Sequence, residues 1–130
     1  MPRSPYNRRV WVVELAPEFE PELLAFPAEV RIELLAQARL IERFGPTARR
    51  PRVDTLNGSK HANMKELRFD AGGGVWRLAF AFDPRRRAIL LAAGDKSGGS
   101  ERTFYRRLIA AADTRFDAHL NRLNRSRARK

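Results

Sequence analysis

Two β-strands joined by a glycine turn constrain the fold of this chain more than any other feature. Residues 64–83 contain three consecutive glycines between two segments in which apolar side chains alternate with other types. Alternation places the side chains of such a hairpin on two faces. One face is wholly apolar and predicts a core: Leu67, Phe69, Trp76, Leu78, Phe80 and Phe82. The opposite face carries a different set: Glu66, Arg68, Arg77, Ala79 and Ala81.

The second face of this hairpin is the first candidate functional site. It presents two arginines and one carboxylate among alanines, which leaves room for a bulky anion such as a phosphodiester. A cross-strand ion pair on a solvated sheet would use the same residues. Both interpretations stay open at this point, but the small Ala79 and Ala81 side chains favour a binding surface.

The charge of the chain also points toward an anionic partner. Lys and Arg number 26 against 15 Asp and Glu, a net charge of +11, and only four of the basic residues are lysines. Guanidinium groups bind phosphate through two parallel hydrogen bonds, so this composition favours a polyanion with salt-sensitive affinity. The alternatives are a charge that serves solubility and a genome that favours arginine codons.

Composition narrows the class of protein further. A chain of 130 residues suits one domain, and the absence of cysteine excludes disulfides, thiolate nucleophiles and cysteine zinc sites. No apolar run is long enough for a membrane span or a signal peptide, so we expect a small cytoplasmic protein. No metal or cofactor is expected, because the two histidines, His61 and His119, have no further ligands at suitable spacing. His119 is expected to be solvated.

The order of expected elements predicts an α+β fold, in which a small antiparallel sheet is covered by an N-terminal helical hairpin and followed by a C-terminal helix. A first strand is expected over residues 10–16, and a helical hairpin over 17–44, interrupted at Pro27. Residues 45–63 form a basic loop, and 88–94 a third strand. Ser100 is placed to cap a final helix whose apolar face packs on the core. We expect a flexible basic segment at 1–9, one domain over 10–120, and a frayed basic tail at 121–130.

Other basic residues are candidate RNA contacts outside the central hairpin. The glycine-rich segment at 94–100 lacks the spacing of a phosphate-binding P-loop, because Asp95 stands where that motif has glycine, although its backbone amides could still help to bind a phosphate. Arg85–Arg87 is either a solvated turn or a second anchor for a phosphate backbone. The complete set of expected RNA contacts is Lys60, His61, Lys65, Arg85, Arg86 and Arg87.

Taken together, these segments resemble the RelE/HigB-like toxins of type II toxin–antitoxin modules, and most closely the phage-derived branch that shares the HigB name. The resemblance lies in residues 56–60 (LNGSK), 64–69 (MKELRF), 74–80 (GVWRLAF), 94–98 (GDKSG) and 104–109 (FYRRLI), and spans about residues 10–120. It implies a RelE-like fold with a basic cleft opposite the helical hairpin. It also implies ribosome-associated mRNA cleavage, inhibition of translation, growth arrest, and a partner antitoxin that often carries a helix-turn-helix domain.

The resemblance also implies a set of catalytic residues. The family's arginine on the second hairpin strand falls on Arg77, and its charged pair on the preceding strand falls on Glu66 and Arg68. The family's later basic and aromatic positions fall on Lys96 and Tyr105. Metal-free cleavage of RNA needs stabilisation of the phosphorane, for which Arg68 and Arg77 are suited, and a base, for which Glu66 is the candidate. Tyr105 or Lys96 would assist the leaving group or position the nucleotide.

Two other classes of function use the same basic face. A non-catalytic RNA-binding or phage regulatory module would bind RNA there without cutting it. A scaffold would bind an acidic protein there, and antitoxin tails are commonly acidic. Mapping RNA 5′ ends after expression of the chain separates cleavage from binding alone.

Overall fold

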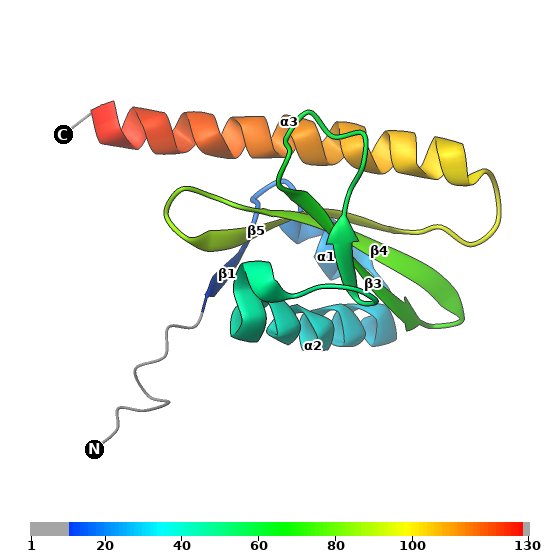
Figure 1. Ribbon diagram of the computed structural model, residues 1–130. Coiled ribbons are helices and arrows are strands. Elements are labelled where there is room, and N and C mark those ends of the chain that lie inside the picture. The colour runs from blue at the N-terminus through cyan, green and yellow to red at the C-terminus, as the bar shows by residue number, and fades with distance from the viewer. Residues whose placement is uncertain (1–10, 129–130) are drawn as a thin grey trace, which may run out of the picture.

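A computed structural model describes residues 11–128, which form one five-stranded sheet flanked by helices (Figure 1). The basic segment expected at 1–9 and the last two residues lie outside the described part. The strand order is β1-β5-β4-β3-β2, with β1 parallel to β5 and every other neighbouring pair antiparallel. The strands are β1 (Val12–Leu15), β2 (Val53–Thr55), β3 (Met64–Ala71), β4 (Gly74–Phe82) and β5 (Arg87–Asp95).

The central hairpin has the predicted strands, and the structure adds their register. Arg68 stands directly opposite Arg77, and Ala71 opposite Gly74. The two-residue turn between the strands consists of Gly72 and Gly73, whose φ angles of 56° and 79° are costly for any residue with a Cβ. The glycine run therefore fixes the register that places the two arginines side by side.

Helices cover both faces of the sheet. The helix α2 (Ala28–Phe44), preceded by α1 (Glu20–Ala25), lies on one side, and α3 (Glu101–Ala128) runs along the other side (Figure 1). The break between α1 and α2 falls at Phe26 and Pro27, as predicted, because proline forces extended geometry on the preceding residue. The predicted Ser100 cap is also present, since its hydroxyl accepts the backbone N–H of Thr103 at 3.2 Å.

The apolar face of the hairpin forms the core under α2, as predicted. Leu67, Leu78 and Phe80 are fully buried, and the Trp76 ring contacts Phe26 at 4.9 Å between centroids. The opposite face has a second apolar layer, which α3 supplies through Leu108, Ala112 and Phe116.

The prediction of an open hollow over Ala79 and Ala81 is wrong. Ala79 and Ala81 are both fully buried, in the second core layer to which α3 contributes Ala112 and Phe116. The alanines are small because a helix packs closely on them, which is an ordinary use of small side chains at a packed interface. Only the part of this face around Glu66, Arg68 and Arg77 keeps a polar character.

Two further features differ from the sequence-based expectation. The short strand β2 lies within the segment expected to be a loop, because three residues carry too little periodicity to be recognised. The helix α3 continues to Ala128 rather than fraying from residue 121. Within residues 11–128, no helix is long and apolar enough to cross a membrane.

Candidate active site

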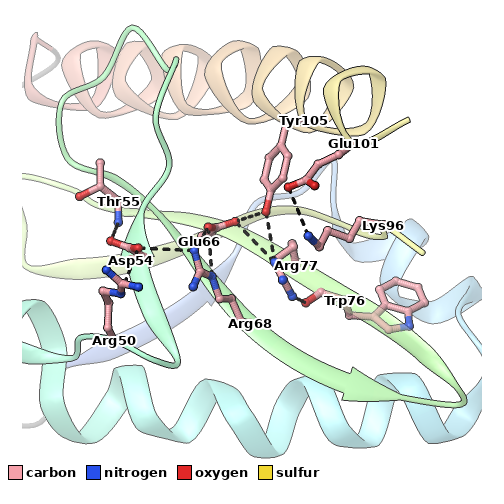
Figure 2. Close-up of polar contacts among 10 residues, drawn as sticks. All are labelled: Arg50, Asp54, Thr55, Glu66, Arg68, Trp76, Arg77, Lys96, Glu101 and Tyr105. Atoms are coloured by element: carbon pink, nitrogen blue, oxygen red, sulfur yellow. Dashed lines mark hydrogen bonds and ion pairs between the residues drawn. The ribbon is translucent and has the colours of Figure 1, made fainter. Parts of the chain in front are cut away.

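The polar cluster on the α3 side of the sheet draws its residues from four elements (Figure 2). β3 supplies Glu66 and Arg68, β4 supplies Arg77, α3 supplies Tyr105, and β2 supplies Asp54. Strand alternation places Glu66, Arg68 and Arg77 on one face, as predicted. Tyr105 lies in the second turn of α3, and its side chain points down toward Glu66 and Arg77.

Glu66 is the centre of this cluster and is only 4% exposed. Its Oε1 accepts a hydrogen bond from the Tyr105 hydroxyl at 2.8 Å, and its Oε2 accepts one from Arg68 Nη2 at 2.9 Å. Arg77 Nε lies 3.8 Å from Oε1 and donates to the Tyr105 oxygen at 3.2 Å. Both carboxylate oxygens of Glu66, the predicted base, therefore already accept hydrogen bonds.

The two arginines are direct cross-strand neighbours, an arrangement in which like charges normally destabilise a sheet. Acidic side chains compensate them. Glu66 contacts both guanidinium groups, and Asp54 Oδ2 lies 3.4 Å from Arg68 Nη2. Arg77 is further fixed by donating to the Trp76 carbonyl at 2.9 Å. The arginines are thus held in place before any ligand arrives.

The protonation states of this cluster follow from its contacts. Hydrogen bonding to Glu66 raises the pKa of Arg68, so its guanidinium stays charged. Burial raises the pKa of the Tyr105 hydroxyl above its ordinary value, and the hydrogen bond to Glu66 raises it further. Tyr105 is therefore a neutral hydrogen-bond donor at physiological pH and can act as an acid.

A hollow of about 350 Å³ gives access to the arginines from solvent. Its lining includes Gln37, Arg52, Arg68 and Arg77, together with Asp70. Arg52 donates to the Gln37 side-chain oxygen at 2.6 Å, so these two lining side chains are held together. Three guanidinium groups against one carboxylate leave an excess of positive charge, which suits a phosphate group.

Lys96 lies near the cluster but is not joined to it by a hydrogen bond. Its Nζ pairs with the exposed Glu101 at 3.3 Å and lies 6.0 Å from the centre of the Tyr105 ring. The structure therefore brings together four of the five predicted catalytic residues, Glu66, Arg68, Arg77 and Tyr105, with Lys96 at the margin.

The loop residues expected to contact RNA pack against α3 instead of lining the hollow. Lys60 and His61 both pair with Asp117, His61 Nε2 at 2.9 Å, and the Ser59 hydroxyl donates to Asp113. Asp117 is twelve residues beyond Tyr105 on the same helix, which is about 18 Å along its axis. These basic groups are thus some distance from the arginine pair.

The remaining basic candidates also lie apart from the cluster. Lys65 is one residue out of phase with Glu66, so strand alternation points its side chain to the opposite face of β3. In the β4–β5 turn, the Arg86 guanidinium stacks over Trp11 at 4.8 Å. Arg87 pairs with Glu14 at 2.9 Å and with Asp83 at 3.3 Å, whereas Arg85 joins the turn through its backbone N–H.

Sequence reasoning missed two polar features. Asp54 belongs to the unpredicted strand β2, so nothing in the sequence placed it beside Arg68. His119 is not solvated as expected: it is 7% exposed, and its Nε2 lies 2.8 Å from Asp83 Oδ2. Across residues 11–128, no group of three His, Cys, Asp or Glu side chains is arranged to hold a metal ion.

The fold is that of a RelE-like α+β protein. A solved structure of E. coli toxin RelE, an arginine-to-alanine double mutant in the free state, superposes with a TM-score of 0.53. The match covers 78% of this chain and 95% of RelE at 12% sequence identity, so it confirms the fold class. At this identity, the match assigns no role of a RelE residue to a residue of this chain.

Sequence relatives identify the family. Residues 21–117 match the model of the phage-derived Gp49-like proteins (DUF891). Two Mycobacterium tuberculosis (strain ATCC 25618 / H37Rv) proteins, named as candidate toxins HigB2 and HigB3, are 47% identical over 88 residues and 44% identical over 103 residues. The aligned parts cover 67% and 79% of this chain, but 43% of HigB2 and 88% of HigB3. The chain belongs to the Gp49-like family, and the predicted HigB-like branch is confirmed.

Proposed function

We propose that this chain is the toxin of a type II toxin–antitoxin module and that it cleaves mRNA without a metal ion. The observation that carries the proposal is the pairing of Arg68 and Arg77 across β3 and β4, with the Tyr105 hydroxyl between Arg77 and Glu66. The names of the HigB2 and HigB3 relatives support the toxin assignment. The hollow beside the arginines supports a nucleic-acid substrate.

The proposed reaction is attack of a ribose 2′-hydroxyl on the adjacent phosphate. Arg68 and Arg77 stabilise the negative charge that develops on the phosphorane, and their fixed positions avoid reorganisation during the reaction. The 2′-oxygen forms the new bond to phosphorus as the 5′-oxygen leaves. The chain must accept the proton of the first oxygen and supply one to the second.

Glu66 and Tyr105 are the proposed proton-transfer groups. Glu66 is nearly inaccessible and already accepts the Tyr105 proton in a hydrogen bond, so Tyr105 is the member of the pair that can reach a substrate. In the proposed step Glu66 accepts the 2′-hydroxyl proton once RNA displaces one of its contacts, and the Tyr105 hydroxyl gives its own proton to the departing 5′-oxygen. Lys96, at the margin of the polar cluster, is a candidate for positioning the nucleotide.

The proposed partners follow from the same assignment. The toxin would act on mRNA at the ribosome, in the cytoplasm, and a cognate antitoxin with a helix-turn-helix domain would neutralise it. Contacts from Lys60, His61, Lys65 and Arg85–Arg87 to RNA beyond the hollow stay predictions. The pairing of Lys60 and His61 with Asp117 weakens the case for those two.

The decisive experiment compares Arg77→Ala with Arg39→Ala, an exposed arginine on α2. Each variant is induced in a bacterial host, growth is followed, and mRNA 5′ ends are mapped. Arg77→Ala should lower cleavage by about 10²-fold or more, whereas Arg39→Ala should cleave normally. Circular dichroism checks the fold of both. Full cleavage by a folded Arg77→Ala protein removes Arg77 from the mechanism.

A non-catalytic RNA-binding module is the second candidate, and one observation favours it. Both Glu66 oxygens are occupied by Tyr105 and Arg68, so the cluster can bind phosphate without offering a free base. Binding of RNA in a gel-shift experiment, together with intact mRNA after induction of the wild-type chain, would identify this function instead.

A further inference from the structure

The last residue of α2, Phe44, is a large apolar side chain that is 46% exposed. The 3₁₀ helix η2 (Gly45–Thr47) follows it directly, and the Thr47 hydroxyl donates to the Phe44 carbonyl at 2.6 Å. The Arg43 guanidinium lies 5.5 Å from the centre of the Phe44 ring. An exposed aromatic ring on a fixed backbone, with a cation beside it, is suited to contact with another flat group.

Phe44 lines a hollow of about 240 Å³, the Phe44 hollow, together with residues of β2 and of the segment between α2 and β2. Most of its lining is apolar: Leu40, Phe44, Ala48 and Val53. The other lining residues are Thr47, Arg49 and Arg52, and among residues 11–128 no Asp or Glu lines it. Pockets for drug-sized ligands are about 300–1,000 Å³, so this smaller hollow suits a single flat ring system.

The Phe44 hollow adjoins the candidate active site, because Arg52 lines both this hollow and the hollow of about 350 Å³ beside the arginine pair. On α2, Gln37 lines the active-site hollow, whereas Leu40 and Phe44 line the Phe44 hollow. These positions are separated by about 4.5–10.5 Å along the helix axis. A stacked nucleic-acid strand rises about 3.4 Å per nucleotide, so the two hollows are about one to three nucleotides apart.

Basic residues continue beyond the Phe44 hollow. Arg49 also lines a hollow of about 410 Å³, to which Arg50 and Lys65 contribute. Its only carboxylate within the described part is Asp54, which Arg50 contacts at 3.7 Å. Figure 2 shows Arg50 and Asp54 at the opposite end of the polar cluster from Tyr105. A polyanion that leaves the arginine pair in this direction therefore meets an excess of positive charge along its path.

We propose that the Phe44 hollow binds a nucleobase of the RNA, a few nucleotides from the phosphate at Arg68 and Arg77, with the Phe44 ring as its stacking surface. The proposal rests on the proposed function for the position of that phosphate. Aromatic rings stack on bases of any sequence, because every base has a π-face. An apolar protein segment would also fill the hollow, but it would leave Arg49 and Arg52 without an anion. RNA brings a phosphate with each base, so RNA is the favoured occupant.

The test compares two single-stranded RNAs of about eight nucleotides, one with bases and one abasic but with the same phosphates. Both carry 2′-O-methyl groups, which remove the attacking hydroxyl, and fluorescence anisotropy measures their affinity for the full chain. The wild-type chain should bind the RNA with bases at least about tenfold more tightly. Phe44→Leu should lower this ratio to about threefold or less, because leucine offers no aromatic face, whereas Phe44→Tyr should retain it.

Two controls separate the base contact from the phosphate contacts and from the fold. Leu35 is also 46% exposed on α2 but lies outside the Phe44 hollow, so Leu35→Ala should leave both affinities unchanged. Arg77→Ala should weaken binding of the two RNAs by a similar factor and leave their ratio unchanged. Circular dichroism checks the fold of every variant.

The outcomes separate this proposal from the toxin assignment. A wild-type ratio near one, or a ratio that Phe44→Leu leaves unchanged, overturns base binding, while growth arrest and cleavage by the wild-type chain would still support the toxin. A ratio that depends on Phe44 in a chain that does not cleave mRNA supports the base site and rejects the cleavage. If Phe44→Leu weakens binding of the protein encoded beside the gene but not of RNA, a protein segment is the occupant and the proposal is refuted.

Discussion

Replacement of Asp83 with alanine should destabilise the fold strongly, because this one carboxylate joins the β4–β5 turn to α3. Its Oδ1 accepts the backbone N–H groups of Arg85 at 2.9 Å and Arg87 at 3.0 Å. Its Oδ2 accepts from the Arg87 guanidinium at 3.3 Å and lies 2.8 Å from His119 Nε2. The Asp83 side chain is fully buried, so water replaces these contacts poorly in the variant.

The magnitude depends on the buried contact with His119. The turn amides can rotate toward water, and Arg87 keeps its second partner, Glu14, at 2.9 Å. Removing one member of a buried charge-assisted pair costs about 3–5 kcal/mol, which is the expected loss in the free energy of unfolding for Asp83→Ala. Asp83→Asn retains an acceptor for the turn amides and should lose about 1–3 kcal/mol.

Urea unfolding at several pH values measures these losses, with Asp70→Asn as the exposed control on β3. Burial raises the pKa of Asp83, but hydrogen bonds from His119 and the Arg87 N–H outweigh it, so the folded pKa lies below the ordinary value. A depressed folded pKa contributes stability above the unfolded pKa of about 4, and this is lost as the pH falls through the folded pKa. The asparagine variant should lack this contribution. A loss below about 1 kcal/mol for Asp83→Ala at pH 7 would refute the reasoning.

Three other predictions test the site and the sheet face that α3 covers. Ala81→Leu should lower the free energy of unfolding by about 1–3 kcal/mol, because Ala81 is fully buried; an unchanged urea midpoint would mean that this face is open. If Tyr105 delivers the proton, cleavage by the wild-type chain should stay constant up to pH 10 or above, since burial raises the pKa of Tyr105, and Tyr105→Phe should cleave about 10²-fold more slowly at every pH. Glu66→Gln should cleave more slowly yet bind a short RNA more tightly in a filter assay, because a neutral amide competes less well for Arg68; weaker binding would contradict this competition.

The central hairpin could be predicted because its signals are local. Strand alternation has a period of two, and one shift of register would move every side chain to the other face, so Glu66, Arg68 and Arg77 had to share a face. The same rule places Lys65 on the opposite face, one position out of phase with Glu66. The strand period alone therefore separates Lys65 from Glu66, Arg68 and Arg77, whereas its charge alone favours an RNA contact.

The features that could not be predicted depend on pairs distant in sequence. His119 and Asp83 are separated by 36 positions, and the sequence around each of them does not predict that they form a buried pair. Asp54 reaches Arg68 from a strand of three residues, too short for a periodic signal. Ala79 and Ala81 are ambiguous in the sequence for a different reason, since small residues suit both a ligand-binding hollow and a closely packed helix. The packing of α3 on this face shows that the second alternative is correct.

The acidic groups of the site explain how two facing arginines can persist in a folded sheet. Arg68 and Arg77 would repel each other without Glu66, which contacts both, and Asp54, which contacts Arg68. Because the same Arg68 Nη2 atom contacts both carboxylates, a phosphate that bound through this atom would exchange places with at least one of them. If the proposed function is correct, that exchange should make RNA binding by the free chain weaker than its charge of +11 suggests. The same carboxylates keep the guanidinium groups oriented before RNA arrives, so affinity lost in the ground state would be compatible with stabilisation of the transition state.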